Sequence, residues 1–573
     1  MGVVRIDKAM RCAVAVVAAL ATRVPLLQGQ ADTIQTNVPA LKDVFAKDFY
    51  IGCLLSYRHI GFPDDPYVPG QSPVVAPNGG YLIKYHMNSM SPGNNMKPQY
   101  TVDIAASAAA YANARTQAER DSIDVHPIVR FNGDLIAQLN WAKRQGFTFR
   151  GHVLVWHNQT PAAFFRSGYT DNGPRLSKEK MTQRMENYIK EVIRLLHEGW
   201  PGLLSAMDVV NEAVLDNGAD RTDSEWYRTF GDNSYILKAF EFTRKYCNLY
   251  GETQIKLYYN DYNTHLPAKA DGIVRVCRPI FEAGYLDGIG MQEHDGLTYP
   301  TAEQWIASYE KFYPICHEMA VTELDVATGY ASPPPEILAK QANQYAQLFK
   351  CFVERSYFSG RGKIISVSKD GLNDQYTFKT NQSSSLWDAR NQCKPAFYAV
   401  VDVGIYYNRL DSLRKALADL RAEDFTPGSW QRFEEAMAAA RIAMERNYSV
   451  DQSAAEALRQ ACVALEAAAE ALEKRESAVP LANNVPSSFS LDQNYPNPFN
   501  SSTTVEFALD APCDVRLLIY DLRGHLVGEA ARGRYEAGRH RVTVDGTSLS
   551  SGTYVYRLIA GGRSETRRFT VVR

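Results

Sequence analysis

The feature that most constrains the fold is an alternation of short apolar runs with helix-period stretches over residues 40–407. Each apolar run ends in polar or charged residues, and six of them are FTFRGHVLVW, LLSAMDVV, IKLYYN, LDGIGM, MAVTELDV and KIISVS. A strand, a few functional residues and a helix, repeated many times, is the pattern of a (β/α)₈ barrel. We therefore predict an α/β fold built on a TIM barrel, with its chemistry at the C-terminal ends of the strands.

The chain changes character after residue 407. Apolar side chains then recur at helical spacing in three stripes, with the breaker Thr426-Pro427-Gly428 before the second. The stripes are Leu410, Leu413, Leu417 and Leu420; Trp430, Phe433, Met437 and Met444; and Leu458, Cys462, Leu465 and Leu472. We expect residues 408–475 to form a small three-helix bundle, which resembles the FIVAR modules found beside carbohydrate-active domains. A plain helical spacer is the alternative interpretation.

The C-terminal part has the composition of a linker followed by a β domain. Residues 476–490 contain Ser, Pro and Asn without a period, whereas residues 491–573 hold apolar or alternating segments punctuated by Gly, which predict a β-sandwich. The ordered motifs LDQNYPNPFNSST, YDLRGHLV and AGRHRVTVDGTSLSSGTYVYRLIAGG closely resemble the C-terminal sorting domain of type IX secretion. This resemblance implies the type IX secretion machinery as a partner. It also implies export through the periplasm of a Gram-negative-type bacterium, to the medium or the cell surface.

The N-terminus has the pattern of a signal peptide over residues 1–31. Arg5, Lys8 and Arg11 precede a short apolar run at residues 12–21, and small residues offer cleavage sites after Ala21 or Ala31. The run is too short to span a bilayer, and a first core helix is the alternative. We expect no transmembrane segment elsewhere in the chain.

Composition excludes several other classes of function. The 573 residues are enough for several domains, and a formal net charge of −2 leaves no basic field to recruit nucleic acid. None of the nine cysteines lies in a CxxC pair, and no histidines show HExxH spacing. We therefore expect no metal site and no cofactor.

Two glutamates at apparent strand ends are candidates for a pair of working carboxylates. Glu212 closes MDVVNEA and Glu323 lies in VTELDV. Hydrolysis of a glycosidic bond needs one carboxyl group to protonate the departing oxygen and another to attack or stabilise the sugar carbon. Strand-end acids are often only solvated caps, and only a closed fold would bring these two residues together.

The surrounding motifs resemble glycoside hydrolase family 10 over nearly the whole block. RGHVLVWHNQTP, DVVNEA, LYYNDYN, GIGMQEH and VTELDV occur in the family's order and spacing, and KPAFYAVVD closes the block. The resemblance implies a (β/α)₈ barrel of retaining enzymes, mostly endo-β-1,4-xylanases, that act on xylan and xylo-oligosaccharides. It implies that Glu212 is the acid/base and Glu323 the nucleophile.

The same resemblance implies a set of substrate-binding positions: Asn94, Lys97, His152, Trp156, Asn211, Tyr262, Gln292 and His294. Asn211 matches the residue that binds the 2-hydroxyl group beside the broken bond, and His294 matches the histidine that keeps the nucleophile ionised. Gln292 is its neighbour near the acid/base. His152 and Trp156 match residues of the −1 sugar site, Asn94 and Lys97 match residues that hold the glycone sugars, and Tyr262 matches an aglycone-side tyrosine.

Four positions depart from the family pattern. Gly93 stands where Glu is usual, Met207 where Trp is usual, and Asp370 and Phe378 replace two further tryptophans. We expect Gly93 to weaken the grip on the −2 sugar, and Asp370 and Phe378 to remove aromatic walls from the −1 region. If Asp370 faces the cleft, its charge would repel the anionic branches of xylan.

Three functions compete on this evidence. The leading hypothesis is a secreted endo-β-1,4-xylanase, the second is a relative that cleaves other β-1,4 glucans or mixed polymers, and the third is a catalytically weak surface protein that binds plant polysaccharide. The presence of both Glu212 and Glu323 favours an active hydrolase, because a protein that only binds has no need for both.

Overall fold

The computed structural model describes residues 34–55, 78–447, 453–474 and 488–573. The chain divides into two compact units, Met1–Lys474 and Arg475–Arg573. The predicted signal peptide and residues 476–487 of the predicted linker lie outside the described residues. No helix in the described ranges is long and apolar enough to cross a membrane.

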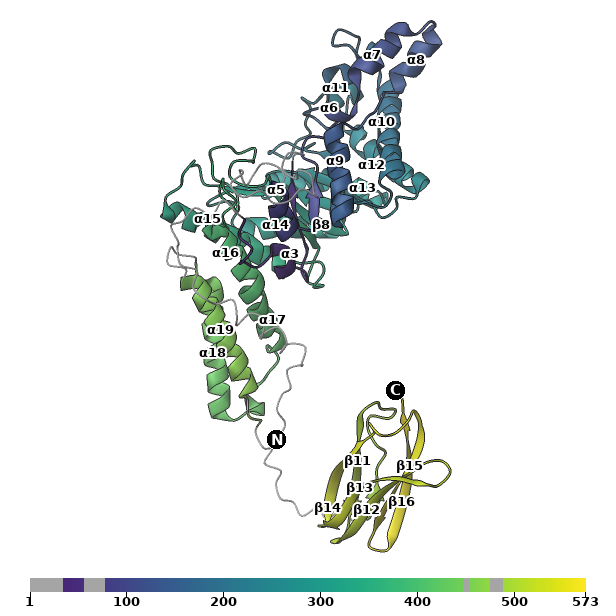
Figure 1. Ribbon diagram of the computed structural model, residues 1–573, viewed down its shortest axis with the longest axis vertical. Helices are drawn as coiled ribbons and strands as arrows, with labels where there is room; N and C mark the ends of the chain where they lie inside the picture. The colour runs from purple at the N-terminus through teal and green to yellow at the C-terminus, as the bar shows by residue number, and fades with distance from the viewer. Residues whose placement is uncertain (1–33, 56–77, 448–452, 475–487) are drawn as a thin grey trace. The chain divides into compact units, whose positions relative to one another are not determined.

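The first unit is built on a closed parallel barrel (Figure 1). Neighbouring strands pair in chain order and the pairing of β6 with β8 closes the ring, while a short extra strand, β7 (His294–Gly296), pairs with the end of β8. The eight described barrel strands are β1 (Tyr50–Leu54), β2 (Ser89–Ser91), β3 (Thr148–Trp156), β4 (Leu204–Asn211), β5 (Lys256–Asp261), β6 (Gly288–Met291), β8 (Glu318–Ala327) and β9 (Ile364–Asp370). The predicted TIM barrel is confirmed.

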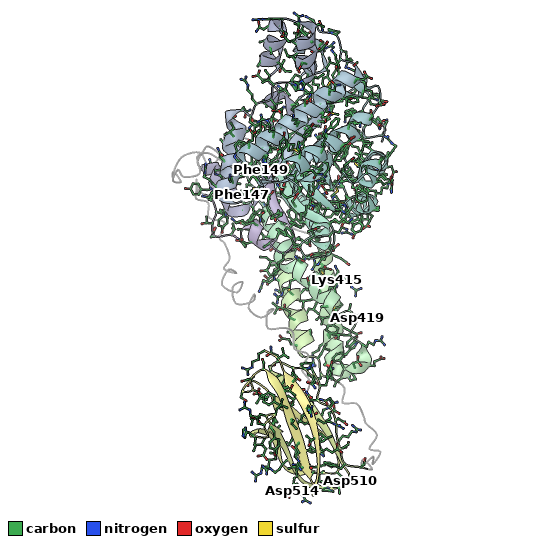
Figure 2. All side chains as sticks on the ribbon, turned by 90° about the vertical axis from the view of Figure 1, so that its right-hand side faces the viewer. Phe147, Phe149, Lys415, Asp419, Asp510 and Asp514 are labelled. Atoms are coloured by element: carbon green, nitrogen blue, oxygen red, sulfur yellow. The ribbon has the colours of Figure 1, made fainter. Side chains whose placement is uncertain are left out.

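The six apolar runs of the sequence form β3, β4, β5, β6, β8 and β9. Their side chains are buried on both faces, as is usual for parallel strands that are covered by helices. Phe149 near the start of β3 is fully buried, and Figure 2 labels it together with Phe147, which precedes the strand. The strands β1 and β2 belong to none of the six runs.

Helices connect the strands and cover the barrel. The described helices of this region are α3 (Leu41–Val44), α5 (Asn78–His86), α6 (Pro98–Thr101), α7 (Ile104–Asn113), α8 (Gln117–Val125), α9 (Gly133–Gln145), α10 (Lys178–Gly199), α11 (Glu225–Phe230), α12 (Ser234–Tyr250), α13 (Pro267–Glu282), α14 (Ala302–Phe312), α15 (Pro335–Glu354) and α16 (Pro395–Asp402). Their ends follow local chemistry. Ser177 caps the start of α10 by accepting a hydrogen bond from the backbone of Lys180, and α9 ends at Gly146, whose φ of 69° suits glycine.

Three further helices follow the barrel within the same unit. They are α17 (Asn408–Ala416), α18 (Pro427–Glu445) and α19 (Ser453–Glu470). They carry most of the three predicted apolar stripes, while Leu417 and Leu420 follow α17 and Leu472 follows α19. A π-helical segment, Val403–Tyr407, joins α16 to α17, so the last barrel helix runs directly into the first helix of this group. The resemblance to FIVAR modules stays a prediction.

The second unit consists of antiparallel strands in two sheets, as the sequence predicts. One sheet has the order β10-β11-β14 and the other β13-β12-β15-β16. The strands are β10 (Ser490–Leu491), β11 (Ser502–Leu509), β12 (Cys513–Tyr520), β13 (Leu526–Tyr535), β14 (Gly538–Asp545), β15 (Gly552–Ala560) and β16 (Arg563–Val571). A core of its own, which includes Phe507, Leu517 and Phe569, holds the unit together.

Candidate active site

The predicted site residues gather at the C-terminal ends of the barrel strands. Asn211 is the last residue of β4 and Glu212 follows it, Gln292 follows β6, and Glu323 lies within β8. His152 and Trp156 lie on β3, while Asn94 and Lys97 follow β2 and Tyr262 follows β5. Barrel closure therefore brings together residues that are far apart in the chain.

A short chain of amides joins the two glutamates. The Asn260 Nδ2 group donates to Glu323 Oε1 at 3.1 Å and to Asn211 Oδ1 at 2.9 Å. Asn211 Nδ2 in turn donates to Glu212 Oε1 at 3.0 Å. Asn260 itself is held by Thr322, whose hydroxyl donates to it at 2.8 Å. The carboxylates of Glu212 and Glu323 thus face one small region of the barrel mouth.

The Glu323 carboxylate is surrounded by positive charge. His294 Nε2 lies 3.3 Å from Glu323 Oε2, and His294 Nδ1 lies 3.0 Å from Asp325 Oδ2. Burial lowers the pKa of His294, but hydrogen bonds to Asp325 and Glu323 outweigh it and raise the pKa to about 10. Burial likewise raises the pKa of Glu323, but the His294 donor and the nearby charges of His152, His294 and Lys97 lower it to about 2. Glu323 is therefore ionised at neutral pH.

The Glu212 carboxylate has mainly neutral donors. Trp156 Nε1 donates to Glu212 Oε2 at 2.9 Å, and Gln292 Nε2 donates to Glu212 Oε1 at 2.8 Å. His157 Nδ1 lies 3.7 Å from Glu212 Oε2, and burial lowers the pKa of this imidazole, which favours its neutral form. Glu212 adopts a φ of 56°, in the left-handed region that non-glycine residues rarely occupy and that is often found at functional sites.

His152 is oriented by a buried ion pair below the mouth. Its Nδ1 lies 2.9 Å from Asp208 Oδ2, and Arg150 Nε donates to the same oxygen at 3.1 Å. A second contact joins the Arg150 guanidinium to the other oxygen of Asp208. The His152 ring is thereby held in place by Asp208.

Lys97 lies over the edge of the site. Its ammonium group donates to Asn94 Oδ1 at 2.7 Å and to Gln159 Oε1 at 2.9 Å, and it lies 4.4 Å from the centre of the Trp156 ring. Burial lowers the pKa of Lys97, against the opposing effect of Glu323 and Glu212. The structure therefore brings Asn94, Lys97 and Trp156 together, and their roles in binding sugar stay predictions.

Tyr262 contacts one member of a buried charge pair and is linked to Glu212. Its hydroxyl accepts a hydrogen bond from Arg221 at 3.1 Å, and the ammonium group of Lys269 lies 3.6 Å from the centre of its ring. Arg221 also donates to the backbone carbonyl of Glu212 at 2.7 Å. Lys269 forms a 2.9 Å ion pair with the buried Asp261, whose pKa burial raises to about 6. Tyr262 and Glu212 are therefore linked through one arginine.

The structure explains two of the departures from the family pattern. Gly93 has a φ of 57°, a conformation that a side-chain-bearing residue would adopt only with strain. Met207 is fully buried and fills the space beside Gly151, where a Cβ atom would lie 2.6 Å from the Met207 methyl carbon. Both positions are thus adapted to their neighbours.

The other two departures differ from expectation. Asp370 is only 6% exposed, and its carboxylate accepts hydrogen bonds from Thr377 Oγ1 at 2.7 Å and from the backbone of Phe378 at 3.3 Å. The expectation that its charge faces the cleft and repels anionic branches is therefore not met. Phe378 is 62% exposed and packs edge-on against His294 with ring centres 4.6 Å apart, so an aromatic surface remains beside the nucleophile.

Two residues that the sequence analysis did not single out complete the site. Asn260 ends the run IKLYYN, and its strand-end position was a signal that could have identified it. Lys379 lies in the loop after β9, and its ammonium group is 2.6 Å from Asp325 Oδ1. No sequence period marks that loop, so only the structure reveals this lysine.

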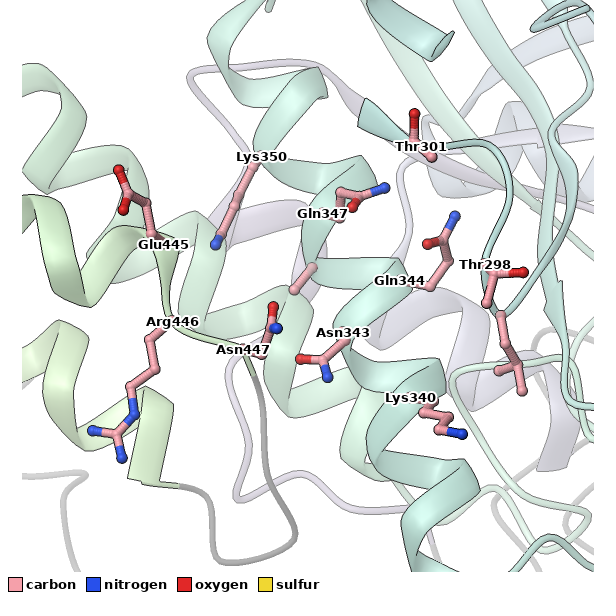
Figure 3. Close-up of a pocket in the computed structure, with 12 residues that line it drawn as sticks. Thr298, Thr301, Lys340, Asn343, Gln344, Gln347, Lys350, Glu445, Arg446 and Asn447 are labelled. Carbon is pink, nitrogen blue, oxygen red and sulfur yellow. The ribbon is translucent and has the colours of Figure 1, made fainter. Parts of the chain in front are cut away.

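A separate cavity of about 420 Å³ lies away from these carboxylates (Figure 3). The close-up shows α15 on one side and the C-terminal end of α18 on the other. The residues that line it include Thr301, Lys340, Gln347, Lys350 and Glu445. Within the described ranges, no group of three or more His, Cys, Asp or Glu side chains is arranged to hold a metal ion.

Comparisons with known proteins agree with this geometry. Endo-1,4-beta-xylanase Y from Acetivibrio thermocellus is 33% identical over 393 residues, which cover 65% of this chain and 33% of the relative. A putative endo-1,4-beta-xylanase from Caldicellulosiruptor saccharolyticus is 34% identical over 321 residues, which cover 54% of this chain and 97% of the relative. The chain thus spans about a third of the first relative and nearly all of the second.

A solved structure shares the fold of the first unit. It is the crystallographic structure of a Clostridium thermocellum endo-1,4-beta-D-xylanase, with CBM22-1 and GH10 modules, complexed with xylohexaose. It aligns with a TM-score of 0.53 and 30% sequence identity over 64% of this chain and 67% of that chain.

Two family models match separate parts of the chain. Residues 493–572 match the model described as a secretion system C-terminal sorting domain, which implies secretion or surface attachment. Residues 40–403, well over half of the chain, match the model of glycosyl hydrolase family 10. They contain the whole barrel and both bridged glutamates, and on that match the chain belongs to glycosyl hydrolase family 10.

Proposed function

We propose that this protein is a secreted retaining endo-β-1,4-xylanase, with Glu212 as acid/base and Glu323 as nucleophile. The observation that carries the proposal is the unequal environment of two carboxylates joined by the amides of Asn211 and Asn260. A nucleophile must be ionised before it attacks, and the His294 imidazolium keeps Glu323 in that form.

The reaction on this arrangement has two steps. In the first step Glu212 gives its proton to the departing glycosidic oxygen while a Glu323 oxygen attacks the anomeric carbon, forming a covalent glycosyl-enzyme. In the second step Glu212, now a carboxylate, takes a proton from water as that water attacks the same carbon and releases Glu323. Two inversions leave the β configuration of the product unchanged.

The remaining residues position the sugar chain. Asn211, next to the acid/base, donates to the 2-hydroxyl group of the reacting sugar, and Gln292 holds Glu212 in place. Asn94 and Lys97 hold the glycone sugars, while His152 and Trp156 line the −1 site. Tyr262 contacts the sugar on the leaving side.

The proposed substrates are xylan and xylo-oligosaccharides. Support comes from the printed names of the relatives and from the xylohexaose bound to the Clostridium thermocellum enzyme. A sugar ring in the mouth would meet the exposed ring of Phe378 as well as the amides and charges around both glutamates. These groups suit a neutral polyhydroxylated chain.

We also propose how the chain is organised for export. Residues 1–31 act as the signal peptide, 40–407 as the catalytic barrel, 408–475 as a helical module, 476–490 as a linker and 491–573 as the sorting domain. The type IX machinery recognises the last segment after passage into the periplasm.

The test of the activity measures both product and stereochemistry. Purified protein is incubated with glucuronoxylan, arabinoxylan and carboxymethylcellulose, and the first products are followed by proton NMR. We expect xylo-oligosaccharides that initially carry the β anomer. An initial α anomer would overturn the retaining assignment, release from carboxymethylcellulose alone would favour a glucanase, and tight binding of xylan without cleavage would favour a binding protein. Glu323→Ala serves as the inactive control.

The test of export compares the full chain with a chain ending at Lys474, the end of the first compact unit. The shortened protein should keep its activity when purified, because the second unit has its own core. In a host with type IX secretion it should accumulate in the periplasm. Secretion of the shortened chain at the full-length level would overturn the proposed role of residues 491–573.

A further inference from the structure

The loop after β9 is tied down by the residue that begins it. Asp370 is the last residue of the strand, and both hydrogen bonds to its carboxylate come from one end of the loop, namely Thr377 Oγ1 and the backbone of Phe378. Asp370 is buried, so its carboxylate accepts hydrogen bonds from the loop and not from bulk water. Asp370 therefore determines where residues 377–379 lie.

The two residues that follow this anchor contact the partners of Glu323. Phe378 packs edge-on against the His294 ring. Lys379 places its ammonium group 2.6 Å from Asp325 Oδ1 and donates to the backbone carbonyl of Asp295 at 3.4 Å. Only 14% of the Lys379 side chain and 1% of the Asp325 side chain are exposed, so solvent screens this ion pair weakly.

Four side chains consequently form a row of alternating charge. The order is the ammonium of Lys379, the carboxylate of Asp325, the imidazolium of His294 and the carboxylate of Glu323, with successive separations of 2.6, 3.0 and 3.3 Å. A buried carboxylate between two cations is held at a defined position, because each cation limits its movement toward the other. Without Lys379, Asp325 would have His294 as the one cation bonded to it and would draw the imidazolium away from Glu323.

We propose that Lys379 is a positioning residue for the nucleophile, acting through Asp325 and His294, and that Asp370 holds the loop that places it. This inference rests on the proposed role of Glu323 as nucleophile. It assigns a function to the chain's own residues at and beside two positions where the family's tryptophans are absent. The loop contributes Lys379, which lies at the end of this row of charges opposite to Glu323.

The experiment uses the full-length protein and xylohexaose as substrate. Lys379→Met keeps the length of the side chain and removes its charge, whereas Lys379→Arg restores the charge. Lys178→Met removes a surface lysine whose 2.7 Å ion pair with Asp232 lies far more exposed, and it serves as the matched control. For each variant, kcat and KM are measured across pH, and folding is checked by thermal unfolding.

We expect Lys379→Met to lower kcat by about 10-fold to 10²-fold, the scale of a small misplacement of a catalytic group, with KM changed by less than about 2-fold. The acid limb of kcat/KM should move to higher pH, because an imidazolium drawn toward Asp325 stabilises the Glu323 anion less, although Lys97 and His152 remain. Lys379→Arg should restore most of kcat, and Lys178→Met should match the wild type. A Lys379→Met protein with wild-type kcat and pH profile overturns the proposal, as does an arginine variant as impaired as the methionine variant.

The anchor is tested by a second pair of variants. Asp370→Asn keeps one oxygen that can accept both hydrogen bonds, so it should retain activity, whereas Asp370→Ala should reproduce the loss seen in Lys379→Met. Equal activity of Asp370→Ala and wild type would overturn the anchoring role. Glu323→Ala separates this inference from the proposed function. If that variant still cleaves xylohexaose, the nucleophile assignment is wrong. If Glu323→Ala is inactive and Lys379→Met has normal activity, only the inference about Lys379 is contradicted.

Discussion

The side-chain groups that contact the carboxylates of Glu323 and Glu212 differ in charge, whereas the two side chains are equally buried. Each side chain is 12% exposed; Glu212 follows β4 and Glu323 lies within β8. Glu323 has His294 in direct contact and Lys97 and His152 nearby, all of which lower its pKa. Glu212 accepts hydrogen bonds from the indole of Trp156 and from side-chain amides, which are neutral.

This comparison shows how one residue type acquires two chemical roles. Burial does not distinguish the two side chains, so the difference between them lies in the groups that contact each carboxyl group. Cationic donors stabilise a carboxylate much more than neutral ones do, which suits a group that attacks while ionised. Neutral donors orient a carboxyl group without committing it to one protonation state, which suits a group that gives and later takes a proton.

The largest expected effect comes from removing either carboxylate. Glu323→Ala should lower kcat/KM by more than about 10⁴-fold on every substrate, since no group remains to form the glycosyl-enzyme. Glu212→Ala should cost about 10²-fold to 10⁴-fold on xylan, the usual range for a general acid. On aryl xylobiosides with acidic leaving groups the loss in the first step should be much smaller. Steady-state and burst kinetics on both substrate types measure these losses. An equal loss from Glu212→Ala on both substrate types would contradict the role of Glu212 as the group that protonates the leaving oxygen.

The next effect tests the cation beside Glu323. His294→Asn removes the imidazolium from between two carboxylates, so Glu323 is less stabilised as an anion and its pKa rises from about 2. We expect kcat to fall by about 10²-fold. We also expect the acid limb of the kcat/KM profile to move to higher pH. An unchanged acid limb in a folded variant would show that His294 does not control the ionisation of Glu323.

A smaller effect is expected on the neutral side. Trp156→Phe removes the indole donor to Glu212 and keeps an aromatic ring, so the loss should be about one hydrogen bond, or about 3-fold to 10-fold in kcat/KM. The acid limb should stay in place, since none of the cations near Glu323 has been removed. A shift of that limb as large as the shift in His294→Asn would contradict the division between the two environments.

The smallest effect concerns stability as a function of pH. The pKa of His294 is raised from 6.5 to about 10 on folding, so its contribution is fully present below pH 6.5 and is lost as pH rises through about 10. The pKa of Glu323 is lowered from 4.5 to about 2, so its contribution is present above pH 4.5 and is lost as pH falls through about 2. Urea unfolding at pH 6, 8 and 10 should show a decline in wild type that is shallower in His294→Asn. Equal declines of stability in wild type and His294→Asn would show that His294 is not the source of the decline.

Much of the barrel and of its chemistry could be predicted from local pattern. The six runs that became β3 to β6, β8 and β9 are long and apolar, because strands buried on both faces need such side chains. The ends of such runs made Glu212 and Glu323 candidates, whereas their roles were implied only by the resemblance of the surrounding motifs to glycoside hydrolase family 10. The strands β1 and β2 lie outside these runs. β2 has three residues and is too short to show a period.

Two further residues of the site, Asn260 and Lys379, were placed by tertiary structure alone. Asn260 on β5 reaches Glu323 on β8, and Lys379 in a loop reaches Asp325, across separations in the chain that no local pattern encodes. The same holds for Asp370, whose sequence position suggested a cleft residue but whose carboxylate is turned into its own loop. A hydrophobic period in the sequence indicates which side chains are buried in the folded protein. Which polar group meets which depends on how the barrel closes and where its loops settle, and the cost of burying an unpaired charge selects that arrangement only once the chain has folded.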